Sequence, residues 1–289
     1  MINKDLNQNL LIIGGTGYLA SHLINFLAKD NIFIIDRKIK NNRLILSPKN
    51  FMEKNIENLC LTDIPENLDL LIHTSYCKNL ESEKQFLNLA REKNPNLKIV
   101  FFSSAAVYGD LYNKERDIFK SSDTPNPIND YGKYKLEIEN FIKTTFQNFQ
   151  ILRISNPYGK EYETRGVYQL FKARIAKSLE SNYQASFMIN YPKARVMVRD
   201  MIFIDDAIKQ IVSVLQKEES GIYNISSGKP IYLEDLAYLA LEDFCQEHKL
   251  ETSMFKLNFL YREKPEGEII QSVLEPIPYE LSLQDSYCN

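Results

Sequence analysis

The stretch that decides the fold is 10–27, which reads LLIIGGTGYLASHLINFL. Four apolar residues run into a glycine-rich turn, and apolar residues then recur at helical spacing, so we predict a buried strand leading directly into a helix. Gly14 and Gly17 permit a tight turn and let backbone N–H groups approach a pyrophosphate, whose charge is favourable at a helix N-terminus. Ala20 is small enough for the helix to pack closely on the sheet. The stretch therefore predicts a dinucleotide-binding turn.

Beyond this stretch, short apolar runs continue to alternate with helical patterns as far as residue 155. The predicted strands cover 9–13, 31–36, 69–73, 98–104 and 149–155. Nearly continuous apolar strands separated by helices indicate a parallel sheet covered on both faces. The sequence thus predicts an α/β fold with a doubly wound parallel sheet of the Rossmann type.

The pattern loosens after residue 155. We predict helices over 166–181, 205–218 and 232–248, a strand pair around 186–200 and a strand over 221–228. We interpret 1–155 as an NAD(P)-binding Rossmann domain, with returning segments near 200–228. The ranges 156–199 and 229–289 are interpreted as a smaller, discontinuous C-terminal substrate-binding lobe.

Composition excludes several classes of partner. The formal net charge of −3, without a basic stripe on any predicted helix, argues against nucleic acid. No apolar run is long enough for a signal segment or a membrane span, so we expect a cytoplasmic protein that does not contact the membrane. Four cysteines (Cys60, Cys77, Cys245 and Cys288) lack C-x-x-C spacing and are accompanied by only three histidines. We therefore expect reduced thiols and no metal.

Asp36 ends the second predicted strand, 22 residues after Gly14. A carboxylate at this point is suited to hydrogen-bond both ribose hydroxyls of an adenosine and would repel a 2′-phosphate. The sequence therefore favours NAD over NADP. Arg37 and Lys38 follow at once and are suited to a 2′-phosphate, so NADP stays open as an alternative.

With these residues in place, the chain resembles the extended short-chain dehydrogenase/reductase superfamily, in particular its NAD-dependent nucleotide-sugar epimerase/dehydratase family. The resemblance covers roughly residues 9–240 and rests on seven motifs in the family's order. These are GGTGYLA (14–20), LIHTS (71–75), FFSSAAVYG (101–109), YGKYK (131–135), RISNPYG (153–159), RDMIFIDDA (199–207) and YNISSGKPIYLEDLA (223–237). Their joint occurrence in sequence is highly specific.

The resemblance implies an enzyme whose catalytic residues are Ser104, Tyr131 and Lys135. Residues four apart lie on one face of a helix, so Tyr131 and Lys135 can face the same site. A nearby cation lowers the pKa of a phenol by favouring the phenolate, which suits Tyr131 to act as general acid/base beside Lys135. Ser104 is suited to hydrogen-bond the substrate oxygen, and Ser103 is the less favoured serine.

The resemblance also assigns binding residues. For the cofactor these are Gly14, Gly17, Tyr18, Leu19, Asp36, Arg37, Asn55, Ile56, Tyr131 and Lys135; for a nucleotide diphosphate sugar they are Ser104, Asn156 and Arg199. The alternative for Arg199 is a salt bridge to Asp200, Asp205 or another acid. We interpret Asp205 and Asp206 as the cap and start of the following helix, and Tyr108 as pocket lining or core packing. His73 is disfavoured as a catalytic group.

Two alanines narrow the chemistry. Family members that dehydrate sugars carry an Asp-Glu pair where this chain has Ala105 and Ala106, and those that epimerise C3 and C5 carry a cysteine beside the serine. The resemblance therefore favours hydride transfer at C4, foremost by a 4-epimerase. The alternatives are an NAD(P)H-dependent 4-ketoreductase of a nucleotide deoxysugar and, from another class, a non-catalytic nucleotide-sensing or scaffold protein. Polysaccharide biosynthesis is the setting that the family suggests.

The chain departs from the family in two places. Ser104 follows His73 by only 31 positions, so part of the segment that contributes to the family's dimerising helix pair is trimmed, and a homodimer is left open. In REKPEGEII (262–270), Arg262 is a candidate second phosphate ligand, but the elements that usually follow it are absent.

Overall fold

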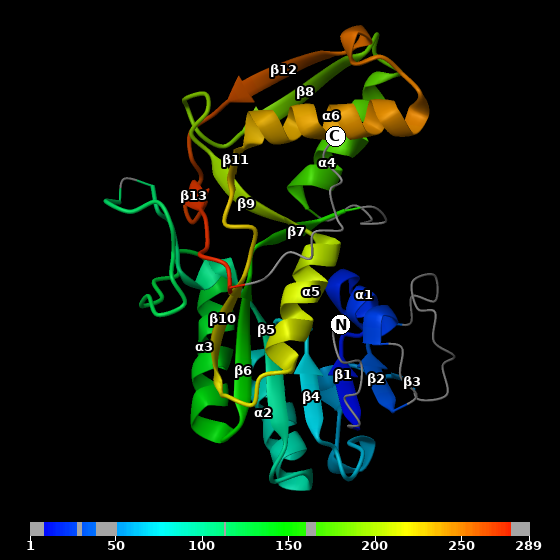
Figure 1. Ribbon diagram of the computed structural model, residues 1–289, viewed down its shortest axis with the longest axis vertical. Helices are drawn as coiled ribbons and strands as arrows, with labels where there is room; N and C mark the ends of the chain where they lie inside the picture. The colour runs from blue at the N-terminus through cyan, green and yellow to red at the C-terminus, as the bar shows by residue number, and fades with distance from the viewer. Residues whose placement is uncertain (1–8, 28–30, 39–50, 113, 160–165, 279–289) are drawn as a thin grey trace.

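The computed structural model describes residues 9–27, 31–38, 51–112, 114–159 and 166–278. A seven-stranded, wholly parallel sheet forms the lower part of the molecule in Figure 1, with the strand order β10-β6-β5-β4-β1-β2-β3. The strands are β1 (Leu10–Ile13), β2 (Ile32–Asp36), β3 (Phe51–Glu53), β4 (Leu70–His73), β5 (Lys98–Ser104), β6 (Phe149–Ile154) and β10 (Gly221–Ile225). The chain order reverses between the neighbouring strands β1 and β4, which confirms the predicted doubly wound fold.

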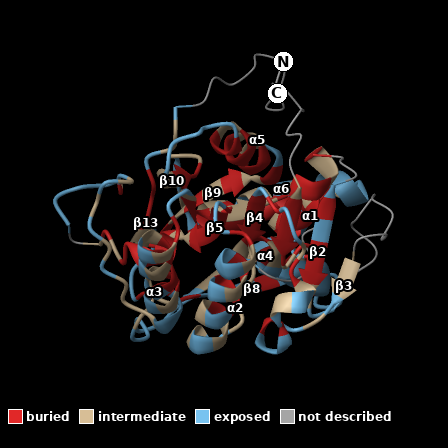
Figure 2. Ribbon diagram, turned by 90° about the horizontal axis from the view of Figure 1, so that it is seen from below, coloured by how far each residue is buried: buried red, intermediate tan, exposed pale blue. Residues whose placement is uncertain are grey.

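Helices cover both faces of this sheet. On one face lie α1 (Tyr18–Leu27) and α5 (Ile204–Leu215), and on the other lie α2 (Leu80–Lys93) and α3 (Asp130–Thr145). Successive residues of a strand point to opposite faces, so in β1 Leu10 and Ile12 pack toward α1 and α5, while Leu11 and Ile13 pack toward α2 and α3. Figure 2 shows these strands in red between the helices. The apolar run at 10–13 is buried on both sides, as a parallel strand requires.

Side-chain caps fix where two of these helices begin. The Asn79 side chain accepts a hydrogen bond from the backbone N–H of Ser82 at 3.1 Å and starts α2. The Asn129 side chain accepts one from the N–H of Gly132 at 2.8 Å and starts α3. Each cap satisfies an otherwise unpaired backbone donor and is typically worth about 1 kcal/mol. The second cap sets the start of the helix that carries Tyr131 and Lys135.

The remaining elements lie in the upper part of Figure 1. One sheet contains β7 (Asn156–Tyr158), β9 (Val198–Phe203), β11 (Pro230–Tyr232) and β13 (Gln271–Ser272), and a second contains β8 (Gln184–Ile189) and β12 (Lys256–Tyr261). They pack with α4 (Val167–Ser178) and α6 (Leu233–His248) around a core of their own. Of the short 3-10 turns, η4 (Thr252–Met254) belongs to this part, whereas η1 (Ile56–Asn58), η2 (Leu61–Asp63) and η3 (Ala105–Val107) follow strands of the parallel sheet. The position of the domain boundary stays a prediction.

The sequence interpretation was wrong in two details. The expected strand pair around 186–200 does not form, because β8 pairs with β12, and β9 pairs with β7, β11 and β13. The N-cap of α5 is Phe203, so Asp205 and Asp206 lie within the first turn instead of capping the helix. Two carboxylates in the first turn still interact favourably with the helix dipole.

Asp200 links the two parts of the fold. Its buried carboxylate accepts hydrogen bonds from the backbone N–H groups of Ser227 (2.9 Å), Gly228 (3.1 Å) and Leu274 (3.2 Å). The turn at 226–228 follows β10 of the large sheet, while Asp200 belongs to β9. A carboxylate that accepts several N–H bonds is a strong local tie. Asp200 thereby joins β9 to the chain that leaves the parallel sheet.

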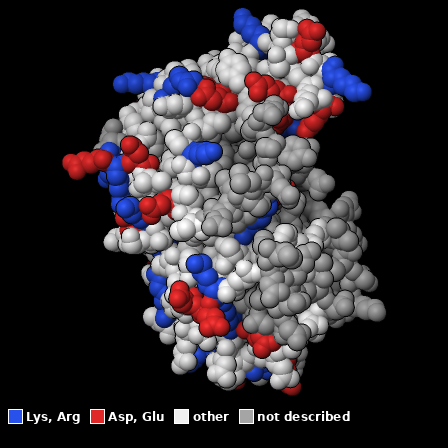
Figure 3. Space-filling view, in the orientation of Figure 1, with Lys and Arg blue, Asp and Glu red and all other residues white. Residues whose placement is uncertain are grey.

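The surface carries both signs of charge. On the face shown in Figure 3, basic and acidic residues are interspersed. Within the described part of the chain, no helix is long and apolar enough to cross a membrane. Cys60, Cys77 and Cys245 are free thiols, and Cys288 lies outside the described residues.

Candidate active site

A cavity of about 1130 Å³ opens at the carboxyl ends of the central strands. Its wall includes Ile13 at the end of β1, Asp36 at the end of β2, Thr74 just after β4 and Ser104 at the end of β5. All ten residues expected to bind the cofactor line it: Gly14, Gly17, Tyr18, Leu19, Asp36, Arg37, Asn55, Ile56, Tyr131 and Lys135. The cavity therefore lies where open parallel sheets place their ligands.

The glycine-rich turn forms one end of the cavity. Gly14 has φ +81°, and a Cβ added to it would lie 2.8 Å from the Thr74 hydroxyl oxygen. A Cβ on Gly15 would lie 2.6 Å from a methyl carbon of Ile34. Both contacts exclude a side chain, and α1 begins at Tyr18, immediately after the turn. The backbone is thus shaped for the close approach of a pyrophosphate to a helix N-terminus.

Asp36 connects the end of β2 to this turn. Its Oδ2 atom accepts hydrogen bonds from the backbone N–H of Thr16 at 2.9 Å and from the Thr16 hydroxyl at 2.6 Å. Arg37 and Lys38 are exposed and line the same end of the cavity. Lys54, which sequence reasoning missed, also lines it, and its ammonium group pairs with Asp63 at 2.6 Å. This end therefore presents one carboxylate and several cations to a ligand.

At the other end of the cavity lie Tyr131 and Lys135, one turn apart on α3. Tyr131 is 39% exposed, whereas Lys135 is 2% exposed. Lys135 Nζ donates to the backbone oxygens of Phe102 at 2.9 Å and Ser75 at 3.3 Å. It lies 6.0 Å from the centre of the Tyr131 ring. The structure therefore places a buried cation directly behind an accessible phenol.

Burial sets the acidity of this lysine. Removal from water lowers the pKa of Lys135 to about 8, although the nearby carboxylates of Glu83 and Glu139 act in the opposite direction. The ammonium group stays largely protonated at neutral pH. Lys135 can then supply the positive charge that favours a phenolate at Tyr131.

The two serines at the end of β5 play different parts. The Ser103 hydroxyl donates to Glu139 at 2.5 Å, and Glu139 is held by Arg153 at 2.7 Å. Ser104 accepts a hydrogen bond from the backbone N–H of Ala106 at 3.2 Å, and its hydroxyl hydrogen is not used in that contact. Of the two, Ser104 is better placed to donate to a substrate oxygen.

Asn156 and Arg199 lie outside the residues that line this cavity. Asn156 donates from its side chain to the backbone oxygen of Asp200 at 3.0 Å. Arg199 pairs with Glu268 at 3.2 Å, so the salt bridge considered as its alternative exists, with Glu268 as the acid. Burial lowers the pKa of Arg199, while Glu268 opposes that effect. Their contact with a substrate diphosphate stays a prediction.

Two further expectations concern buried side chains. His73 is fully buried and contacts Glu83 at 2.9 Å, which agrees with a role other than general acid/base. Tyr108 is 2% exposed and donates to the Asn224 side chain at 2.7 Å. Of the two interpretations of Tyr108, core packing is therefore the one that the structure supports.

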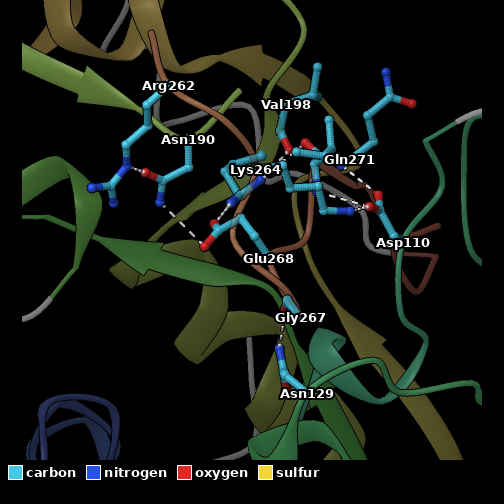
Figure 4. Close-up of polar contacts among 11 residues, drawn as sticks. Asp110, Asn129, Asn190, Val198, Arg262, Lys264, Gly267, Glu268 and Gln271 are labelled. Atoms are coloured by element: carbon cyan, nitrogen blue, oxygen red, sulfur yellow. Dashed lines mark hydrogen bonds and ion pairs between the residues drawn. The ribbon is translucent and has the colours of Figure 1, made fainter. Parts of the chain in front are cut away.

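A polar cluster surrounds the segment 262–271 (Figure 4). Arg262 donates to the Asn190 side chain, which in turn donates to Glu268 at 3.4 Å. Lys264 donates to Asp110 at 3.1 Å, and Asp110 also accepts from the backbone N–H of Gln271 at 2.9 Å. Each cation of this cluster already has a protein acceptor. A ligand that binds here must therefore compete with carboxylates or an amide.

Sequence reasoning missed the cavity-lining residues that follow β3 and β4: Lys54, Thr74, Ser75, Tyr76, Cys77 and Lys78. Residues 74–78 follow β4, which the sequence predicted, and Lys54 follows β3, which was not predicted but pairs with the predicted β2. The rule that ligands bind at the carboxyl ends of parallel strands would have indicated the stretch 74–78. Among the described residues, no group of three or more His, Cys, Asp or Glu side chains is placed to hold a metal ion.

Comparisons with known proteins identify the family and the fold. The model of the NAD dependent epimerase/dehydratase family matches residues 10–226. A putative UDP-glucose 4-epimerase of Methanocaldococcus jannaschii is 24% identical over 291 residues, which cover 92% of this chain and 89% of the relative. A dTDP-D-glucose 4,6-dehydratase of Dictyostelium discoideum is 26% identical over 82% of this chain and 63% of the relative. The structure of Thermus thermophilus UDP-glucose 4-epimerase in complex with NAD has a TM-score of 0.72 and 18% identity, covering 92% of this chain and 90% of that one.

Proposed function

The chain belongs to the NAD-dependent epimerase/dehydratase family of enzymes, and on that premise we propose that it is a nucleotide-sugar 4-epimerase that keeps NAD bound. The observation that carries the proposal is the shared cavity. Ser104, Tyr131 and Lys135 line the same space as the glycine-rich turn and Asp36. A proton-transfer group and a dinucleotide site therefore open to one another.

NAD is the cofactor that this site fits. The turn from Gly14 to Gly17 and the N-terminus of α1 would hold the pyrophosphate, Asp36 the adenosine ribose and Lys135 the nicotinamide ribose. The Ser75 hydroxyl is buried beside the cavity and has no hydrogen-bond partner among the residues described, as expected of a group that meets a ligand. When bound, NAD accepts a hydride from the sugar carbon and returns it.

The chain's own residues move and hold the proton. Tyr131 takes the proton of the C4 hydroxyl and returns it to the same oxygen once the configuration at C4 has been inverted, a proton transfer worth roughly 10²–10⁴-fold in rate. Lys135 stabilises the phenolate that forms between these two transfers. The Ser104 hydroxyl donates a hydrogen bond to the same oxygen and keeps it within reach of Tyr131.

Ala105 and Ala106 distinguish this reaction from dehydration. Both belong to η3, directly after Ser104, and both are buried methyl side chains. Elimination of water needs an additional acid and base at the sugar, and a methyl group can be neither. These two positions therefore favour epimerisation over the dehydration that the name of the dTDP-D-glucose 4,6-dehydratase relative describes.

The test is to denature the purified protein, identify the nucleotide that it releases, and incubate native protein with UDP-glucose or UDP-galactose without added cofactor. We expect about one NAD per chain and interconversion of the two sugars. Protein that releases no NAD, and that instead consumes NADPH with a nucleotide 4-keto sugar, would establish the ketoreductase. Arg37 and Lys38 on the cavity wall are the observation that favours this second candidate. Nucleotide binding without turnover of any nucleotide sugar would indicate the sensing or scaffold protein.

A further inference from the structure

A fully buried carboxylate lies behind the Tyr131–Lys135 pair. Glu83 of α2 is 0% exposed, and its two oxygens contact three titratable side chains. His73 at the end of β4 contacts Oε1 at 2.9 Å, while the Cys77 thiol donates to Oε2 at 3.2 Å. The Tyr134 hydroxyl also donates to Oε2. Burying a carboxylate is costly, so a site built around one calls for an explanation.

These contacts join three elements at the active site. Tyr134 is the neighbour of Lys135 on α3, and Cys77 belongs to the segment 74–78, which forms part of the cavity wall. The same segment supplies the Ser75 carbonyl to Lys135, and its Tyr76 ring lies edge-on to Tyr131 with 5.1 Å between the ring centres. Glu83 thus fastens the segment 74–78, through Cys77, to α3, through Tyr134 next to Lys135.

The buried charges of this region form two sets. Glu139 accepts two hydrogen bonds from Arg153, at 2.7 and 3.1 Å, so these two charges neutralise one another. Glu83 forms the other set with the His73 ring, 2.9 Å from its Oε1 atom, and with Lys135, whose positive charge acts on it. Since Lys135 donates to backbone oxygens and not to a carboxylate in the contacts described, Glu83 supplies a counter-charge without occupying the ammonium hydrogens. At least one of the three hydrogens stays available for a ligand.

We propose that Glu83 is a positioning residue of the active site, which keeps the buried Lys135 ammonium protonated and holds the segment 74–78 against α3. Although burial acts to raise it, the pKa of Glu83 is held at about 2 by His73, Lys135 and Tyr134, so the carboxylate is ionised throughout the neutral range. The titratable and charged groups around Lys135 and Glu83 are His73, Tyr76, Cys77, Tyr131, Tyr134, Glu139 and Arg153. Burial raises the pKa of Cys77, so its thiol is uncharged and does not replace Glu83 as an anion.

The test compares Glu83→Gln, which keeps the shape and removes the charge, with Glu83→Asp, which keeps the charge. Glu81→Gln is the matched control, because Glu81 lies on the same helix with a side chain that is 84% exposed. The readout is the pH titration of the Lys135 Cε signal by NMR, in full-length ¹³C-lysine protein as purified and without substrate. Lys135→Met assigns the signal.

Loss of a nearby negative charge disfavours the ammonium form, so Glu83→Gln should move the Lys135 midpoint down by about one pH unit or more. Glu83→Asp and Glu81→Gln should leave it near the wild-type value. The basic limb of the kcat/KM profile should move in the same direction in Glu83→Gln. An unchanged midpoint in a folded Glu83→Gln variant overturns the proposal.

If Glu83→Gln does not fold, the Lys135 midpoint is measured in wild type and in Glu83→Asp instead. A wild-type midpoint below pH 7 contradicts the proposal. Only the kinetic readout rests on the proposed function. A shifted NMR midpoint in a protein that turns over no nucleotide sugar would leave the role of Glu83 intact and refute the 4-epimerase.

Discussion

The cofactor end of the molecule, around the cavity, and the proposed substrate end, around the segment 262–271, differ in how their cations are paired. Around the cavity, the turn at Gly14 is open to a ligand and Lys135 donates only to backbone oxygens in the contacts described. Around the segment 262–271, Arg199 pairs with Glu268 and Lys264 with Asp110. The cavity presents its groups directly to a ligand, whereas the diphosphate that we propose to bind near Arg199 would have to displace the carboxylate of Glu268. Substitution of acidic residues around the segment 262–271, as well as of basic ones, should therefore change the affinity for the nucleotide sugar.

The largest effect is expected at the cavity, from Tyr131→Phe. Loss of the phenol removes the proton-transfer group and should lower kcat by about 10²–10⁴-fold. Tyr131 is 39% exposed, so the melting temperature should change little. Steady-state kinetics with UDP-glucose and a thermal melt check both points. Tyr238→Phe is the control, since Tyr238 is an exposed tyrosine of α6. Turnover equal to wild type in Tyr131→Phe would refute the catalytic assignment.

The next largest effect concerns the turn. Gly14→Ala places a methyl group against the Thr74 hydroxyl at φ +81°, a backbone region that costs a non-glycine residue about 1–2 kcal/mol. If this free energy opposes only the turn conformation that binds NAD, the affinity for NAD should fall roughly tenfold or more. Calorimetric titration of NAD into protein from which the bound nucleotide has been removed measures this loss. Gly221→Ala should retain NAD, because the three atoms nearest to an added Cβ there all belong to the side chain of Tyr223 and the position lies outside the cavity wall. Wild-type affinity in Gly14→Ala would show that the turn does not hold the cofactor.

The cofactor end could be predicted from the sequence more fully than the proposed substrate end. The parallel strands and the cofactor residues follow from local order: an apolar run, a turn and a helix bring Gly14 and Asp36 to one edge of the sheet. The pairing of β8 with β12 joins 184–189 to 256–261, and nothing local in either run specifies such a distant partner. The pairing of Arg199 with Glu268 is equally non-local.

Glu83 shows a second limit. It lies in LESEKQFLNLAREK (80–93), a charge-rich helix whose pattern is typical of a solvated face, yet it is fully buried. Its burial is possible only because His73, Cys77 and Tyr134 come from other elements to contact its oxygens. Composition and periodicity report the average face of a helix. They do not reveal a single acid that tertiary contacts bury.

At the substrate end, Arg199→Met should raise the KM for the nucleotide sugar by about tenfold, with a smaller change in kcat. A hydrogen bond to a charged group is worth about 1.5–3 kcal/mol, but part of that gain is already taken by Glu268 in the free protein. Steady-state kinetics separate KM from kcat. Arg195→Met is the matched control, because Arg195 forms an exposed ion pair with Asp235 in the same part of the molecule. Equal effects of the two variants would mean that Arg199 does not bind the diphosphate.

The smallest effect, and the sharpest test of the comparison, is expected from Glu268→Gln. Removing the carboxylate leaves Arg199 without its competing anion, so the KM for the nucleotide sugar should fall, by about fivefold at most for an ion pair worth 0.2–1 kcal/mol. The gain should shrink in high salt, since ions screen the interaction of Arg199 with a phosphate. NAD affinity should stay unchanged, because Glu268 does not line the cofactor cavity. If the KM of Glu268→Gln rises instead, Glu268 itself helps to bind the substrate. In that case its carboxylate does not compete with the diphosphate for Arg199.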